Sequence, residues 1–206
     1  WIQTIEGAIL SPREATWLFI FTSALMFALR FCAHFIEHKL GLKPVSILLV
    51  CAVFACIGLR LVSGVTTFNG ALAALTVYAL GKTFFWPTML AVASDRFPRC
   101  GAVAISIMGG LGMMSAGLVG SPGLGYAKDR FAGEALQQSN PAAYAEFKAG
   151  TPSDWLIFEK VNGIDGKKLS DARKVDADKQ TPAQKAAIEA DVTGARRTLV
   201  ADSFIP

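Results

Sequence analysis

Four apolar stretches in the first part of the chain limit what it can fold into. They cover residues 15–36, 44–62, 67–93 and 101–119, and each approaches or exceeds the roughly 20 residues that a helix needs to cross a bilayer core about 30 Å thick. Each stretch would form a helix that is apolar around its whole circumference, which is typical of helices in lipid or in a large core. A soluble bundle would need charged outer faces, which these stretches lack. We therefore predict an all-α integral membrane protein with about four transmembrane helices.

The charged residues divide the chain into two parts. Residues 1–127 hold 8 of the 20 Lys and Arg and 4 of the 16 Asp and Glu, so the net charge of +4 lies entirely in this part. This layout lacks the clustered basic face of a nucleic-acid binder. We predict the end of a preceding helix and an outer loop over 1–14, transmembrane helices over 15–127, and a polar, partly helical tail over 128–206.

Basic residues in the short links predict the orientation. Residues 38–43 and 96–99 carry basic side chains, whereas the link between the second and third stretches has no charge. Short cytoplasmic loops are enriched in Lys and Arg, so the first and third links should face the cytoplasm. The tail, residues 128–206, is then extracytoplasmic. Within it, Thr181 and Pro182 suit the start of a helix.

The pentapeptide from His34 to His38 spells H-x-x-E-H, a pattern of some zinc enzymes. A helix would place both histidines on one face, with Glu37 as a general base. A catalytic zinc also needs a third protein ligand, and the chain has 2 histidines and few acids before the tail. Residues 120–125 are glycine-rich but lack the strand–turn–helix setting of a dinucleotide site. We expect no metal site, no cofactor and no enzymatic activity.

Two segments resemble the major facilitator superfamily of membrane transporters. Ala33, Glu37, His38, Gly41 and Lys43 follow, with one extra residue, the order of the family's loop signature G-x-x-x-D-R-x-G-R-K. The run FFWPTML…FP…GA…GG.G resembles the tenth and eleventh helices of bacterial members. The resemblance covers about residues 1–127. It implies a twelve-helix bundle to which this chain contributes the eighth to eleventh helices.

That resemblance implies secondary active transport of a small solute by alternating access, in the inner membrane of a bacterium. The chain starts with Trp1 and shows no signal peptide. We expect a fragment whose partners are the lipid bilayer, a solute and the missing N-terminal half of the same protein. The alternative is a non-transporting membrane anchor that displays the tail. Lys82 and Pro87 within one span favour transport, since an anchor needs neither.

Lys82 lies near the middle of the third stretch, where a charge is costly unless it meets a cavity or a partner. We expect it to face the substrate pathway and bind an anionic or hydroxyl-rich solute; the alternative is a structural pair or a stem that reaches the interface. Phe85 and Trp86 could stack on a sugar ring or form a gate, or face lipid and neighbouring helices. Pro87 removes a helix hydrogen bond and predicts a kink, and hence a hinge.

Two further sets of residues are candidates for conformational change. Arg30 is expected to pair with acids at the inner mouth and otherwise to reach toward the interface. Small residues every fourth position let membrane helices pack closely. The predicted cytoplasmic charge network comprises Arg30, Glu37, His38, Asp95 and Arg96, and the predicted packing row comprises Gly112, Ala116 and Gly120. The coupling ion cannot be read from the residues.

Overall fold

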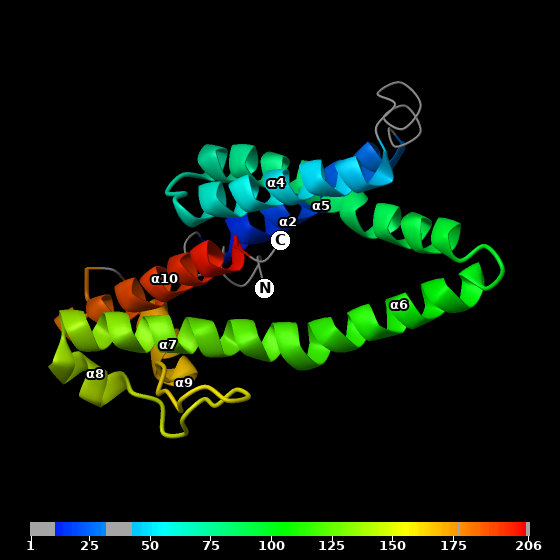
Figure 1. The fold of residues 1–206 in the computed structure, drawn as a ribbon. Helices are drawn as coiled ribbons and strands as arrows, with labels where there is room; N and C mark the ends of the chain where they lie inside the picture. The colour runs from blue at the N-terminus through cyan, green and yellow to red at the C-terminus, as the bar shows by residue number, and fades with distance from the viewer. Residues whose placement is uncertain (1–10, 32–42, 177, 205–206) are drawn as a thin grey trace.

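The computed structural model describes residues 11–31, 43–176 and 178–204 (Figure 1). Within these ranges the chain is helical, with two isolated β-bridges. The elements in chain order are α2 (Pro12–Phe31), α4 (Pro44–Ser63), α5 (Phe68–Arg96), α6 (Gly101–Ser115), the π-helical turn η1 (Ala116–Gly120), α7 (Ser121–Ser139), α8 (Pro141–Phe147), α9 (Gly166–Lys174) and α10 (Pro182–Asp202). The predicted all-helical class is confirmed for this part of the chain.

Three helical stretches are long and apolar enough to cross a membrane. They are Arg13–Phe31 in α2, Pro44–Ser63 in α4, and Gly101–Ser139, which joins α6, η1 and α7. Helix α5 covers the third predicted stretch, but it is not among the three, because Lys82 near its middle and other polar residues lower its mean hydropathy. The prediction of a membrane protein is supported by these helices, while the count of four stays a prediction.

Helices α4 and α5 pack backbone against backbone. A Cβ atom added at Gly58 would lie 2.5 Å from Cα of Tyr78, and one added at Gly81 would lie 2.5 Å from the backbone nitrogen of Ala55. A side chain at either position would force the two helices apart. Glycine therefore sets the close contact, as is common between helices in membranes.

Helices α6 and α7 form one continuous helical stretch with the π turn η1 between them (Figure 1). The predicted boundary between residues 127 and 128 lies inside α7, so the tail begins as a continuation of the fourth predicted span. No residue of α6 or η1 is buried. In contrast, α7 packs along α10.

The tail folds back onto the apolar helices through α10, which lies beside both α7 and α4 (Figure 1). Ala195 and Leu199 of α10 are buried in the same cluster as Leu59 of α4. Arg196 donates a hydrogen bond of 2.8 Å to the carbonyl of Val65, which follows α4. These contacts fix the end of the tail against the Ser63 end of α4.

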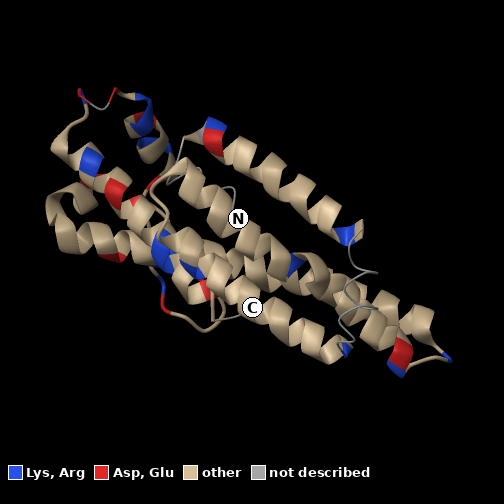
Figure 2. Ribbon diagram, turned by 90° about the horizontal axis from the view of Figure 1, so that it is seen from above, with Lys and Arg blue, Asp and Glu red and all other residues tan. Residues whose placement is uncertain are grey.

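The tail also has a core of its own. Thr181 caps α10 in a capping box with Gln184, which confirms the predicted start of this helix. The buried Asp191 of α10 pairs with Lys128 of α7 at 3.0 Å and with Arg173 of α9 at 2.7 Å. The core cluster consists of Leu136, Ala143, Phe147, Leu169, Ala172, Ala187 and Ala190. Charged side chains gather over this tail, whereas the apolar helices carry few of them between their ends (Figure 2).

Candidate solute-binding pocket

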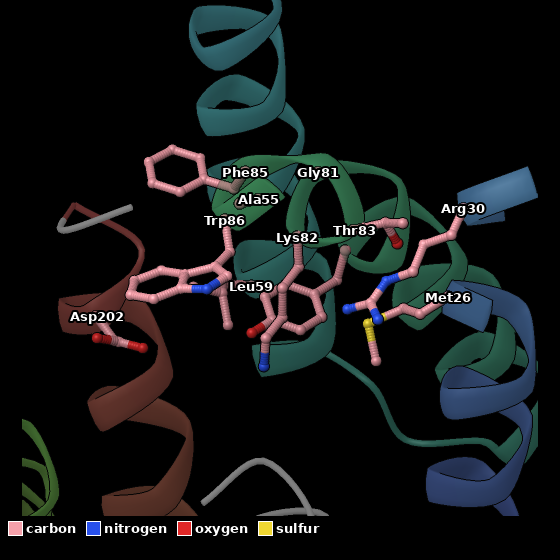
Figure 3. Close-up of a pocket in the computed structure, with 11 residues that line it drawn as sticks. Met26, Arg30, Ala55, Leu59, Gly81, Lys82, Thr83, Phe85, Trp86 and Asp202 are labelled. Carbon is pink, nitrogen blue, oxygen red and sulfur yellow. The ribbon is translucent and has the colours of Figure 1, made fainter. Parts of the chain in front are cut away.

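A pocket of about 460 Å³ lies where α2, α4, α5 and the end of α10 meet (Figure 3). Its lining is mainly apolar, with two basic side chains, Arg30 and Lys82, and one acidic side chain, Asp202. The predicted pathway residues Phe85 and Trp86 also line it. A mostly apolar concave site with a few charged groups is typical of small-molecule binding sites.

Lys82 lies on the wall of this pocket, roughly halfway along α5. Its Nζ is 5.5 Å from the centroid of the Tyr78 ring, one helical turn earlier, which is within the range of a cation–π interaction. No carboxylate within the described ranges forms an ion pair with this ammonium group. An aromatic face stabilises the charge but accepts no N–H···O hydrogen bond, so all three donors remain available to a solute.

Arg30 lines the same pocket from α2, near the end of the helix opposite Pro12. Figure 3 shows Arg30 and Met26 on one side of Lys82, with Trp86 and Asp202 on the other. Arg30 is therefore a second cation of the candidate site. Its placement there is a finding that the sequence did not predict.

The predicted cytoplasmic charge network is described only in part. Glu37 and His38 lie outside the described residues. Asp95 and Arg96 are exposed at the end of α5, and no ion pair joins either to Arg30 in the part of the chain that the structure describes. The network stays a prediction.

Asp202 brings an acid from the tail to the pocket. It ends α10, and burial raises the pKa of its carboxyl group while the positive charge of Lys82 acts in the opposite direction. Sequence reasoning missed this residue because it lies in a polar segment 120 positions after Lys82. The signal that could have found it is the spacing of Ala195, Leu199 and Asp202, which places the three on one face of a helix.

Trp86 links the pocket to α6. A Cβ atom added at Gly112 would lie 2.6 Å from Cη2 of the Trp86 indole, so the ring lies directly on this glycine. Gly112 thus contacts a side chain of α5, while its role in close helix packing stays a prediction. Pro87 is exposed, and α5 continues through it as one helix; its role as a hinge stays a prediction.

The other members of the predicted packing row have a different setting. Ala116 and Gly120 are exposed and belong to η1. A Cβ added at Gly120 would meet within 4 Å the carbonyl oxygen of Ser115, from the same helical stretch. The row thus meets a partner helix at Gly112, while a partner for its other end is not seen among the described residues.

No family model, no curated protein and no solved structure matches this chain. Function is therefore inferred from the pocket and from the apolar helices that surround it. Among the described residues, no group of three His, Cys, Asp or Glu is placed to hold a metal ion. His34 and His38 of the H-x-x-E-H pattern lie outside these residues.

Proposed function

We propose that the protein is part of a secondary transporter that moves a small organic solute across a membrane. The observation that carries the proposal is the position of Lys82 on a pocket formed by apolar helices, with no ion pair among the described residues. A charge between membrane helices is expensive and usually marks a solute or ion pathway. Asp202 lines the same pocket, but no ion pair joins it to Lys82 in the part of the chain that the structure describes.

The walls of the pocket support a solute with polar groups and an apolar or ring-shaped body. Lys82 and Arg30 can donate hydrogen bonds to oxygen atoms of the solute, while Trp86 and Phe85 offer ring faces. A sugar or a related organic solute has both features. The volume of about 460 Å³ lies within the range of small-molecule sites.

The proposal places this chain in the second half of a major-facilitator transporter, with its tail outside the cell membrane. In that arrangement the missing half covers the open face of α6 and completes the pocket. The ring of Trp86 on Gly112 couples α5 to α6, so a movement of α6 changes one wall of the pocket. Alternating exposure of the solute would follow from rocking of the two halves.

The test is uptake of a labelled solute panel by the full-length protein in vesicles, with and without an imposed proton gradient. Lys82→Met keeps the length of the stem but removes the charge, and it should abolish uptake of the transported solute while the protein still inserts. Arg99→Met is the matched control, because Arg99 is an exposed cation in the link between α5 and α6. Normal uptake by Lys82→Met would overturn the assignment of Lys82.

The anchor alternative predicts a different result in the same assay. An anchor would show no uptake of any panel member above empty vesicles, and neither substitution would change it. Binding of the panel to detergent-solubilised protein, measured by calorimetry, then separates a transporter without its coupling ion from a protein that has no solute site.

A further inference from the structure

The tail contains a short hairpin whose tip is apolar and exposed. Isolated β-bridges pair Lys148 with Ile164 and Ser153 with Val161, and the chain turns between them. The tip consists of Leu156, Ile157 and Phe158, with exposed fractions of 73%, 96% and 48%. Three adjacent apolar side chains held in water are unfavourable, since each would gain by leaving water. The tip therefore needs a cover.

The hairpin holds its tip in a fixed conformation. The rings of Trp155 and Phe158 are stacked, with centroids 5.2 Å apart and planes 7° from parallel. Leu156 between them has a φ angle of 52°, in the left-handed region that few non-glycine residues adopt. The hydroxyl of Tyr126 in α7 donates to the carbonyl of Glu159 at 2.7 Å, which ties the hairpin to α7.

The contacts with α7 show which way the tip points. At the base of the hairpin, Ser153 donates to the carboxylate of Asp129. Nearer the tip, the ring of Trp155 lies on Gly123, where an added Cβ would be 2.8 Å from it. Gly123 is about 9 Å nearer to α6 than Asp129, at about 1.5 Å per residue. The hairpin therefore runs back along α7 toward the apolar part of the long helix (Figure 1).

The tip lies beside the end of the uncharged part of that helix. From Gly101 to Gly123 the helix rises roughly 33 Å at about 1.5 Å per residue, close to the bilayer core of about 30 Å. This part has no charged residue, and Lys128 is the first one after it. Tyr126 and Trp155, which lie beside this point, are the residue types that concentrate at membrane interfaces.

We propose that Leu156, Ile157 and Phe158 insert into the bilayer surface beside α7, with Trp155 and Tyr126 at the level of the headgroups. Lipid is the occupant that the structure favours, because the tip is fixed to a helix that is long and apolar enough to cross a membrane and lies beside the end of its uncharged part. The charged neighbours agree with this placement: Asp154 and Lys160 flank the apolar tip, form an exposed ion pair of 3.7 Å and can remain in water. The inference does not depend on transport.

The test places a spin label on the tip of the full-length protein in single-copy lipid nanodiscs. Ile157→Cys is made in a variant whose four cysteines are replaced, and Gly150→Cys, an exposed site near the hairpin base, is the matched control. We expect the label at 157 to collide with oxygen and to be several-fold less accessible to a water-soluble nickel complex than the label at 150. Equal accessibility of the two sites to nickel would overturn the proposal.

A second measurement separates lipid from a protein cover and does not use the cysteine variants. Trp1, Trp17 and Trp86 are replaced by Phe, so that Trp155 is the remaining tryptophan. Lipids brominated near the headgroup should quench its fluorescence, and the added substitution Ile157→Asp should reduce the quenching. Absence of quenching in single-copy nanodiscs would overturn the lipid assignment. Quenching that is present there but lost in multi-copy vesicles would overturn it as well, because a second copy would then cover the tip.

Discussion

Two glycine-rich regions of this molecule have opposite surroundings. In the α4–α5 pair, Gly58 and Gly81 face the backbone of the other helix so closely that no Cβ atom fits. In α6 and η1, a Cβ atom added at Gly109 or Gly117 would meet nothing within 4 Å. Both regions are apolar and small-residue-rich, yet one contact is complete within this chain and the other face is open. The composition of a helix shows that it can pack closely, but it does not show which of its faces contacts a neighbouring helix.

The largest expected effect comes from adding a side chain at the close contact between α4 and α5. Gly81→Val would place branched carbon atoms against Ala55 and the carbonyl of Cys51, which are backbone atoms that cannot move aside. We expect a loss of about 3 kcal/mol or more in stability, at the upper end for overpacked sites. Thermal unfolding of the purified protein in detergent measures it.

Gly117→Val is the matched control for that experiment, because it adds the same side chain at an open position. It should leave the unfolding temperature of this chain nearly unchanged. A loss of stability as large as that of Gly81→Val would show that the face of η1 is already covered, and the comparison between the two regions would be wrong.

The next largest effect concerns the ion pairs that hold α7 and α9 to α10. Helix α7 is covered by α10, and Asp191 joins them through Lys128 while also holding Arg173 of α9. Asp191→Ala leaves two cations without their partner, and we expect a loss of about 2–3 kcal/mol, typical of buried hydrogen bonds to charged groups. Proteolysis of the tail should become faster, whereas Asp171→Ala, which removes an exposed ion pair, should have little effect.

A smaller effect is expected at the contact between α5 and α6. Gly112→Ala places a methyl group against the rim of the Trp86 indole, which is the far end of a side chain and can turn aside. We expect a change in stability of less than about 1 kcal/mol, but a clear change in the fluorescence of Trp86. The same change from Gly109→Ala, which has open space, would argue against the contact.

The apolar helices are predictable from the sequence because length and hydropathy decide their structure. The helices α2 and α4 overlap most of the first two predicted apolar stretches, α6 lies within the fourth, and Thr181 caps α10 as expected. These features depend on local composition, which is readable from the chain alone. The case of α5 shows the limit, since Lys82 makes it both the best candidate for function and too polar to be counted by composition as a span.

The parts that sequence reasoning missed depend on contacts between distant residues. The spacing of Ala195, Leu199 and Asp202 places Asp202 on the packed face of α10, but it does not reveal the pocket of Lys82, because α10 must first pack on α4. Likewise, the π turn at Ala116–Gly120 follows from no residue pattern that we can name. The position of Arg30 on the pocket could not be read from its distance to the helix end, because that distance does not show which neighbours face it.

The smallest expected effect is a pH dependence of the docking of α10 onto α4. Burial raises the pKa of Asp202 above its ordinary value of 3.8. Just above pH 3.8, Asp202 is therefore still protonated when α10 is docked but already ionised when α10 is undocked. The side with more bound protons is favoured by acid, so docking of α10 weakens as the pH rises through this range. Asp202→Asn has no such titration and should keep the docked state at neutral pH.

Hydrogen exchange of α10, corrected for intrinsic rates, measures this: the wild-type helix should become less protected from mildly acidic to neutral pH, and the Asn variant should not. Asp176→Asn, at an exposed carboxylate, is the control that should behave as the wild type. Protection that rises with pH in the wild type would mean that the attraction of Lys82 outweighs burial, and Asp202 would then act as an ion-pair partner across the pocket.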